Sequence, residues 1–140
     1  MTDYNFQNLS YVEFESLVQD LLQEELDIKL ERFTSGRDGG IDLRYSKGAE
    51  NVIVQCKKYQ EFNPLFSELK KEVEKVKLLK PSRYIIATSV GLTPLQKDKI
   101  KDLFSPFIHE TGDIWGREDL NNAITVYEHI ENRHFKLWLS

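Results

Sequence analysis

The first clear pattern of apolar and polar positions along the chain is helical. Apolar residues recur every three or four positions at Tyr11, Phe14, Leu17, Val18, Leu21 and Leu22. This spacing lines one face of a helix, so we expect a helix over residues 11–25. Ser10, three residues before Glu13, forms the sequence pattern of a capping box and marks the start of that helix.

Three strands should follow this helix. Segments 28–33 and 41–45 alternate apolar and polar residues, as half-buried strands do. Residues 51–57 form a β-branched run, which the Lys47–Gly48 loop joins to the preceding strand. The pattern therefore predicts an antiparallel hairpin near the middle of the chain.

The next pattern is again helical. Asn63 and Pro64 suit an N-cap and a first helical position, and the pattern stops before Pro81. The predicted buried stripe consists of Phe66, Leu69, Val73, Val76 and Leu79. We expect a long second helix between these limits.

Shorter elements complete the chain. Residues 83–89 are mostly apolar, as in a central strand, and Thr93-Pro94 opens a helix through about Leu103. The remaining predicted elements are a short strand at 107–110, a last strand at 113–115, a short helix near 118–124 and a C-terminal helical stretch.

This alternation predicts an α/β fold with α-β-α layers, in which helices flank both faces of a mixed central sheet. The hairpin should be antiparallel and the later strands parallel. With 140 residues and 40% hydrophobic content, the chain suits one compact domain. We expect that domain to span residues 1–126, with residues 127–140 as a helical extension.

Composition favours a cytoplasmic protein that does not enter a membrane. No apolar run approaches the roughly 20 residues that cross a bilayer, and the first residues lack the pattern of a signal peptide. The single cysteine, Cys56, has no partner for an internal disulfide and is expected to be a buried strand residue.

Charge is distributed unevenly around a net value of −4. Residues 1–31 carry eight acidic residues and one basic residue, whereas residues 57–101 carry eleven basic and five acidic ones. The second segment suits either a cationic face for nucleic acid or ordinary solvated lysines on helices. The overall charge argues against a domain that binds nucleic acid through bulk electrostatics alone.

A polar cluster is predicted on the hairpin. Side chains alternate across a strand, so Gln55 and Lys57 share one face with Ile53. If the hairpin closes around residues 46–51, Asp42 falls opposite Gln55, and paired residues share a face with Cβ atoms about 5 Å apart. The three polar side chains would then converge, although an exposed polar sheet edge would explain them as well.

Such a cluster suits metal-assisted hydrolysis of a phosphodiester. The carboxylate of Asp42 and the amide oxygen of Gln55 are hard ligands for Mg²⁺, and Lys57 can hold phosphate oxygens or orient a water. On the first helix Glu15 is the better third ligand, because it lies at the edge of the apolar arc while Glu13 serves the capping box. A surface ion pair is the alternative for Glu15.

The joint pattern resembles the Mrr-like branch of the PD-(D/E)XK nucleases. It consists of "FESLVQDLL", then "GRDGGID", twelve intervening residues and "QCKKY", and the likeness extends over about residues 10–115. The resemblance implies a restriction-endonuclease-like fold, with Glu15, Asp42 and Gln55 as metal ligands and Lys57 as the catalytic lysine. Ile41 stands where the superfamily has its name-giving proline, which is usual in this branch.

The expected function is therefore that of a Mg²⁺-dependent endonuclease acting on DNA, with duplex DNA as the expected form and Mn²⁺ as a substitute metal. Arg37, Lys58, Gln96 and Lys97 are the candidates for holding backbone phosphates. Cutting should need several copies brought together, as an oligomer or in a larger chain. The alternatives are a nuclease-fold module that binds DNA without cutting it, and an oligomerisation domain.

The tail carries a second, shorter resemblance. "DIWGREDLNNAI" and "HFKLWLS" are similar to the segment that joins Mrr-like nuclease domains to the NTPase core of some antiviral STAND proteins. It implies an effector domain in defence and a chain that continues into a further domain. A terminal helix packed on its own core explains the apolar tail equally well.

Overall fold

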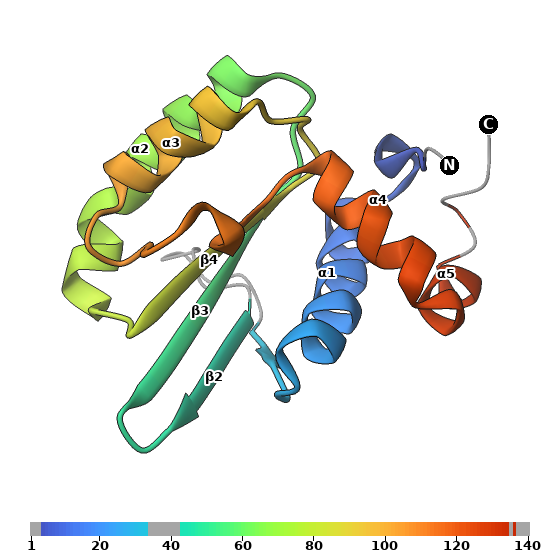
Figure 1. Ribbon diagram of the computed structural model, residues 1–140, viewed down its shortest axis with the longest axis horizontal. Helices are drawn as coiled ribbons and strands as arrows, with labels where there is room; N and C mark the ends of the chain where they lie inside the picture. Colours follow the sequence, from blue (N-terminus) through green and yellow to red (C-terminus); the bar gives the residue numbers. More distant parts are fainter. Residues whose placement is uncertain (1–3, 34–42, 135, 137–140) are drawn as a thin grey trace.

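A five-stranded mixed sheet lies at the centre of the molecule, as a computed structural model shows (Figure 1). The structure describes residues 4–33, 43–134 and 136. The strands, in their order across the sheet, are β1 (Glu31–Arg32), β2 (Leu43–Lys47), β3 (Glu50–Lys57), β4 (Arg83–Thr88) and β5 (Ile114–Trp115). β1 to β3 pair antiparallel and β3 to β5 pair parallel, which confirms the predicted mixed α/β sheet.

The β2–β3 hairpin has the predicted register. Its pairs run from Leu43 opposite Val54 to Lys47 opposite Glu50. Gly48 lies in the turn with φ of 60°, a conformation that glycine adopts without a steric cost. The hairpin closes around residues 46–51, as the predicted pairing of Asp42 with Gln55 requires.

One helical layer covers the sheet face that carries Val52, Val54 and Cys56. It contains α1 (Tyr11–Leu26), α4 (Arg117–Val126) and α5 (Glu128–Arg133), which Figure 1 shows together on one side of the sheet. The capping box that begins α1 is confirmed, since Ser10 and Glu13 exchange both hydrogen bonds. Cys56 is buried, as expected of a strand residue.

The other layer consists of α2 (Phe62–Leu79) and α3 (Pro94–Leu103), which lie side by side (Figure 1). They cover the opposite face of the sheet, and α3 begins with the predicted Thr93 cap. The predicted cap of α2 is wrong, because Glu61 and not Asn63 precedes its first residue. Pro64 is tolerated as the third residue because the first-turn N–H groups have no partner within the helix.

Two predicted strands differ in the structure. Segment 28–33 contributes only Glu31–Arg32 as strand, because side chains of α1 bind the backbone just before it: Gln23 accepts from the N–H of Leu30 and Gln19 donates to its carbonyl. Segment 107–110 forms no strand. It follows a turn after α3 in which the N–H of Phe107 donates to the carbonyl of Phe104.

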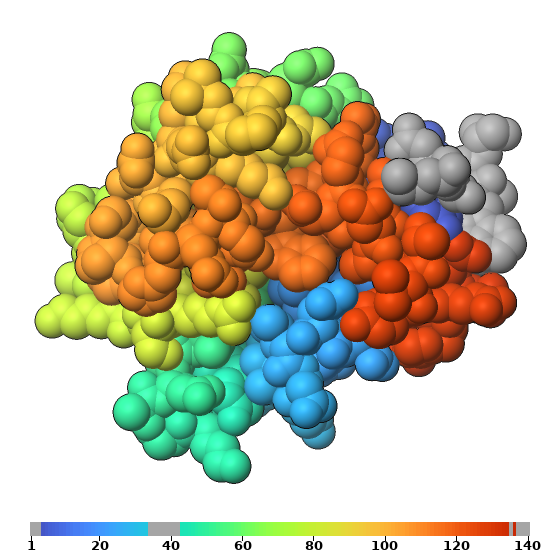
Figure 2. All heavy atoms as spheres, in the orientation of Figure 1, coloured from blue at the N-terminus to red at the C-terminus, as the bar shows by residue number. Residues whose placement is uncertain are grey.

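The segment after α4 packs on the same core. Ile130 is 1% exposed in the cluster that includes α1, and Arg133 and His134 both contact Asp20. Figure 2 shows α3, α4 and α5 on one face of the molecule above the hairpin. The division between residues 1–126 and 127–140 stays a prediction. None of the described helices combines the length and the apolar character needed to span a membrane.

Candidate active site

Gln55 and Lys57 are buried side chains of the central strand β3. They are 2% and 9% exposed and point, with Ile53, toward the layer formed by α2 and α3. The predicted alternation is thus confirmed, and the alternative of an exposed polar sheet edge is wrong for these two residues. Burial of an amide and an ammonium is costly without partners, so their contacts define the site.

Gln55 has a partner on the neighbouring parallel strand. The hydroxyl of Tyr84 donates a hydrogen bond to Oε1 of Gln55 over 3.4 Å. Tyr84 is fully buried, and its ring packs against Phe104 with the ring centroids 5.0 Å apart. This contact draws the amide oxygen of Gln55 toward β4.

Lys57 has an acidic partner on α2. Its Nζ lies 3.5 Å from Oε1 of Glu72, which is 7% exposed. The other carboxylate oxygen of Glu72 is buried and, within the described part of the chain, has no hydrogen-bond donor. Nζ of the partly exposed Lys75 lies 3.8 Å from this second oxygen.

Sequence analysis missed Glu72 because only apolar residues were counted in the stripe of α2. The fully buried row of α2 consists of Leu65, Leu69, Glu72 and Val76, while Phe66, Val73 and Leu79 lie beside it. Glu72 comes three residues after Leu69 and four before Val76, which is the spacing of one helix face. This spacing was the feature of the sequence that could have identified Glu72 as a buried residue.

Glu15 lies in the other helical layer, on α1. It is 9% exposed, and its Oε1 is 3.8 Å from the guanidinium of Arg32 on β1. Arg32 pairs in turn with Leu43, the first described residue of β2. The predicted boundary position is confirmed, and the ion pair suggested as the alternative is present between the buried Glu15 and the exposed Arg32. The role of Glu15 as a metal ligand stays a prediction.

Asp42 and Arg37 lie outside the described residues. Among residues 4–33, 43–134 and 136, no three histidine, cysteine, aspartate or glutamate side chains gather closely enough to hold a metal ion. Gln55 and the unsatisfied oxygen of Glu72 face the layer of α2, whereas Glu15 lies in the layer of α1; each offers an oxygen of the kind that hard cations bind. A magnesium site built from the predicted ligands therefore depends on Asp42.

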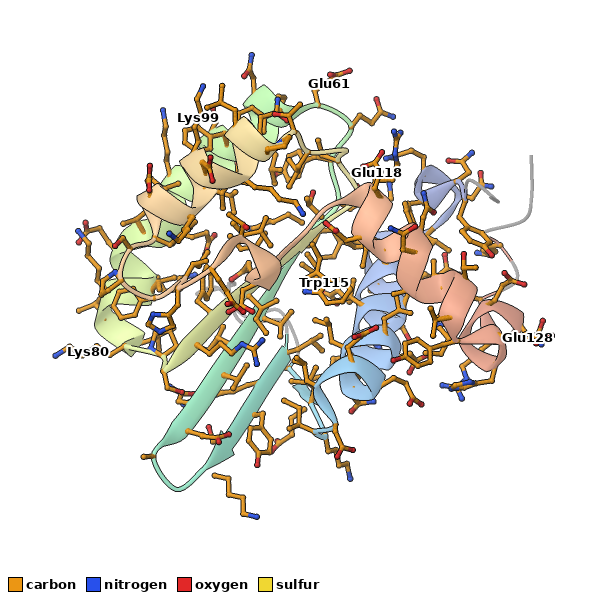
Figure 3. All side chains as sticks on the ribbon, in the orientation of Figure 1. Glu61, Lys80, Lys99, Trp115, Glu118 and Glu128 are labelled. Carbon is orange, nitrogen blue, oxygen red and sulfur yellow. The ribbon has the colours of Figure 1, made fainter. Side chains whose placement is uncertain are left out.

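Three candidates for phosphate contacts lie within the described residues, and they differ in their side-chain partners. Nζ of the half-buried Lys58 donates to Oε1 of Gln7 over 3.1 Å. Gln96 takes part in the capping box of α3, and Nζ of Lys97 lies 2.7 Å from Asp119. Lys97 therefore shares its charge with a carboxylate. Figure 3 shows further lysines on the same layer, with Lys99 on α3 and Lys80 at the end of α2.

A small open pocket lies at the carboxyl ends of β3 and β4, which is where open α/β sheets commonly bind ligands. It measures about 240 Å³, and its polar lining includes Gln7, Gln60, Ser89 and Arg117. Burial, followed by the charge of Glu68, raises the pKa of nearby Tyr59, so this hydroxyl stays neutral at pH 7. The edge of the sheet beyond Lys57 thus presents mainly neutral donors.

Comparison with known proteins supplies the family. A family model described as a restriction endonuclease, the Mrr catalytic domain, matches residues 6–100. The chain belongs to the Mrr-like restriction endonuclease family. The mixed sheet with helices on both faces is consistent with the restriction-endonuclease-like fold of this family, and the match contains Gln55, Lys57 and Glu72.

One relative extends the similarity over nearly the whole chain. The uncharacterized protein y4cD of Sinorhizobium fredii (strain NBRC 101917 / NGR234) is 38% identical over 137 residues, which is 96% of this chain. The chain spans only 21% of the length of that relative. Membership of the family suggests nuclease activity for the matched domain.

Proposed function

We propose that the chain is a Mg²⁺-dependent endonuclease domain that hydrolyses phosphodiester bonds in duplex DNA in the cytoplasm. The observation that supports this most is the pair of buried polar side chains, Gln55 and Lys57, on one face of the central strand of an Mrr-family domain. Neither side chain benefits the core where it lies, because burial of polar and charged groups costs free energy. A role in chemistry accounts for both.

Glu15, Asp42 and Gln55 would hold the metal ion, and Mn²⁺ would replace Mg²⁺. When bound, the ion lowers the pKa of a coordinated water and offsets the charge that develops on the phosphate. Gln55 contributes a neutral oxygen where a carboxylate would add a negative charge, so one metal ion is a better match than two.

Lys57 would hold a phosphate oxygen or direct the attacking water. An ammonium group is a compact point charge, and inside a site with little water its attraction for a phosphate is stronger than at the surface. Tyr84 keeps the amide of Gln55 in place for the same reaction. Arg37, Lys58, Gln96 and Lys97 would bind backbone phosphates without reading sequence.

The net charge of −4 points to weak DNA binding by an isolated copy. Joining several copies raises the effective concentration at the DNA, so we expect efficient cutting from an oligomer or a multidomain protein. The much greater length of the y4cD relative supports the second arrangement. A defence effector domain, linked to a STAND-type NTPase core, is the biological setting that we propose.

The decisive experiment is a plasmid-nicking assay with Lys57→Ala. Loss of the charge should reduce cutting by about 100-fold or more, the size expected when one preorganised group at a reacting phosphate is removed. Lys99→Ala is the matched control, because Lys99 is exposed on α3, and it should cut like the parent. Equal cutting by Lys57→Ala and the parent would point to a contaminating nuclease and overturn the proposal.

A second candidate is a module that binds DNA without cutting it. It is favoured by the neutral Gln55, which adds no negative charge to hold a cation. Gel-shift and nicking assays with the same preparation separate the two functions. A metal-independent DNA shift with no cutting in Mg²⁺ or Mn²⁺ would favour the binding module.

A further inference from the structure

Glu72 occupies a place in α2 that an apolar side chain would suit better. The residues before and after it in the buried row, Leu69 and Val76, pack in the core between α2 and the sheet. Glu72 itself is only 7% exposed. A carboxylate must give up its hydration to lie here, so its presence calls for a compensating contact or a function.

Its contacts compensate for only part of that loss. Oε1 of Glu72 is 3.5 Å from Nζ of Lys57, whereas Oε2 is buried without a hydrogen bond from any described residue. Lys75 attracts Oε2 only from 3.8 Å and is itself partly exposed. A buried ion pair of this kind stabilises a fold little or not at all compared with apolar residues of the same size.

We infer that Glu72 is a positioning residue for Lys57. The ammonium of a lysine ends a flexible four-carbon stem, so burial of the stem alone does not fix where the charge lies. Glu72 fixes the charged end from α2, while the backbone of β3 fixes the other end. The ammonium is then already in place when a phosphate arrives, which removes part of the ordering that the reaction would otherwise require.

This role rests on the proposed nuclease function, in which Lys57 acts on the scissile phosphate. It differs from a role for Glu72 as a metal ligand, which the unsatisfied Oε2 would also suit. The two roles predict different results: a ligand contributes to Mg²⁺ affinity, whereas a positioning residue contributes to turnover at saturating Mg²⁺.

Three single variants in the full chain test the inference. Glu72→Gln keeps the shape and removes the charge, and Glu72→Asp keeps the charge but shortens the reach. Glu74→Gln is the matched control, because Glu74 lies on the same helix, is 84% exposed and pairs with a lysine in the same way. Kinetics of plasmid nicking, Mg²⁺ calorimetry and thermal melting are measured on each variant.

At saturating Mg²⁺, Glu72→Gln should lower kcat by about 10-fold to 100-fold, the usual effect of losing a partner that orients a catalytic group. KM for DNA and the Mg²⁺ affinity should change by less than about twofold, since Glu72 contacts neither in this role. Glu72→Asp should fall between Glu72→Gln and the parent, which also gives a result if the first variant folds poorly. Glu74→Gln should match the parent.

A Lys57→Ala background adds a sharper criterion. Glu72→Gln should cause no further loss there, because nothing is left to position. Unchanged kcat in Glu72→Gln, an additional loss in the Lys57→Ala background, or a weakened Mg²⁺ affinity would each overturn the inference. A parent that stays inactive even when its copies are joined would overturn the proposed function, whereas an active parent with a fully active Glu72→Gln would overturn only the role of Glu72.

Discussion

The hydroxyl of Tyr84 donates a hydrogen bond to Oε1 of Gln55, so an interior residue of β4 orients the amide that neighbours Lys57 on β3. Both residues are buried, and a buried hydrogen bond of this kind restricts the amide more than one exposed to water. The hydroxyl of Tyr84 therefore restricts the directions that the amide oxygen of Gln55 can take.

Tyr84→Phe tests this orientation. The ring that packs against Phe104 is kept, so we expect a loss of only about 1 kcal/mol in the free energy of unfolding. Cutting should fall more clearly than stability, by about tenfold, because the amide oxygen is then free to turn. Urea unfolding and plasmid nicking measure the two effects, and Tyr45→Phe on β2 serves as the control. Unchanged cutting would show that the hydroxyl serves only the core.

Gln55→Glu tests whether the amide oxygen is a metal ligand. A carboxylate at this position would add a charged hard ligand, so Mg²⁺ should bind about tenfold more tightly or better. Gln55→Ala should lose both measurable Mg²⁺ binding and most of the cutting. Calorimetry with Mg²⁺ on the two variants and the parent provides the comparison. Equal affinities in all three proteins would remove Gln55 from the metal site.

A double replacement separates stability from chemistry at the Lys57–Glu72 pair. Replacing both residues by apolar ones, as Lys57→Met with Glu72→Leu, removes two buried charges together. The free energy of unfolding should stay equal or rise by about 1–4 kcal/mol. Each single replacement should instead destabilise the fold, because it leaves the other charge buried without its partner. Urea unfolding measures all four proteins, and a clear loss of stability in the double variant would mean that the pair holds the fold together.

Local pattern was sufficient to predict most elements of the fold. The capping box of α1, the Thr93-Pro94 start of α3 and the β-branched run of β3 each depend on residues within a few positions of one another. The errors arose where distant groups intervene. The side chains of Gln19 and Gln23 bind the backbone of Leu30, and no pattern within segment 28–33 contains that information.

The candidate site was predictable to the extent that one strand determines it. Alternation alone places Gln55 and Lys57 on the same face of β3, and the structure confirms this. Tyr84 and Glu72 reach the site from β4 and α2, so finding them requires the packing of those elements on β3. The helical spacing of Glu72 marked it as a buried residue, whereas no sequence pattern in the mostly apolar β4 pointed to a role for the hydroxyl of Tyr84.

The last prediction concerns pH and the segment after α4. Asp20 of α1 accepts from His134 over 2.8 Å and lies 3.0 Å from Arg133. Burial alone would raise the pKa of Asp20, but the hydrogen bond from His134 and the positive charge of Arg133 outweigh it and lower the pKa below its ordinary value of 3.8. A lowered pKa means that the ionised carboxylate favours the folded state.

This stabilisation is complete above the ordinary pKa and is lost as the pH falls through the lower folded value. At pH 5, Asp20→Asn should therefore reduce the free energy of unfolding by about 1 kcal/mol, a modest figure because the side chain of Arg133 is 61% exposed and solvent screens its charge. The difference from the parent should shrink below pH 4. Urea unfolding at pH 5, 4 and 3 measures it, with the exposed Glu118→Gln as control. A difference that stays constant with pH would mean that packing of the side chain, and not its charge, attaches this segment to α1.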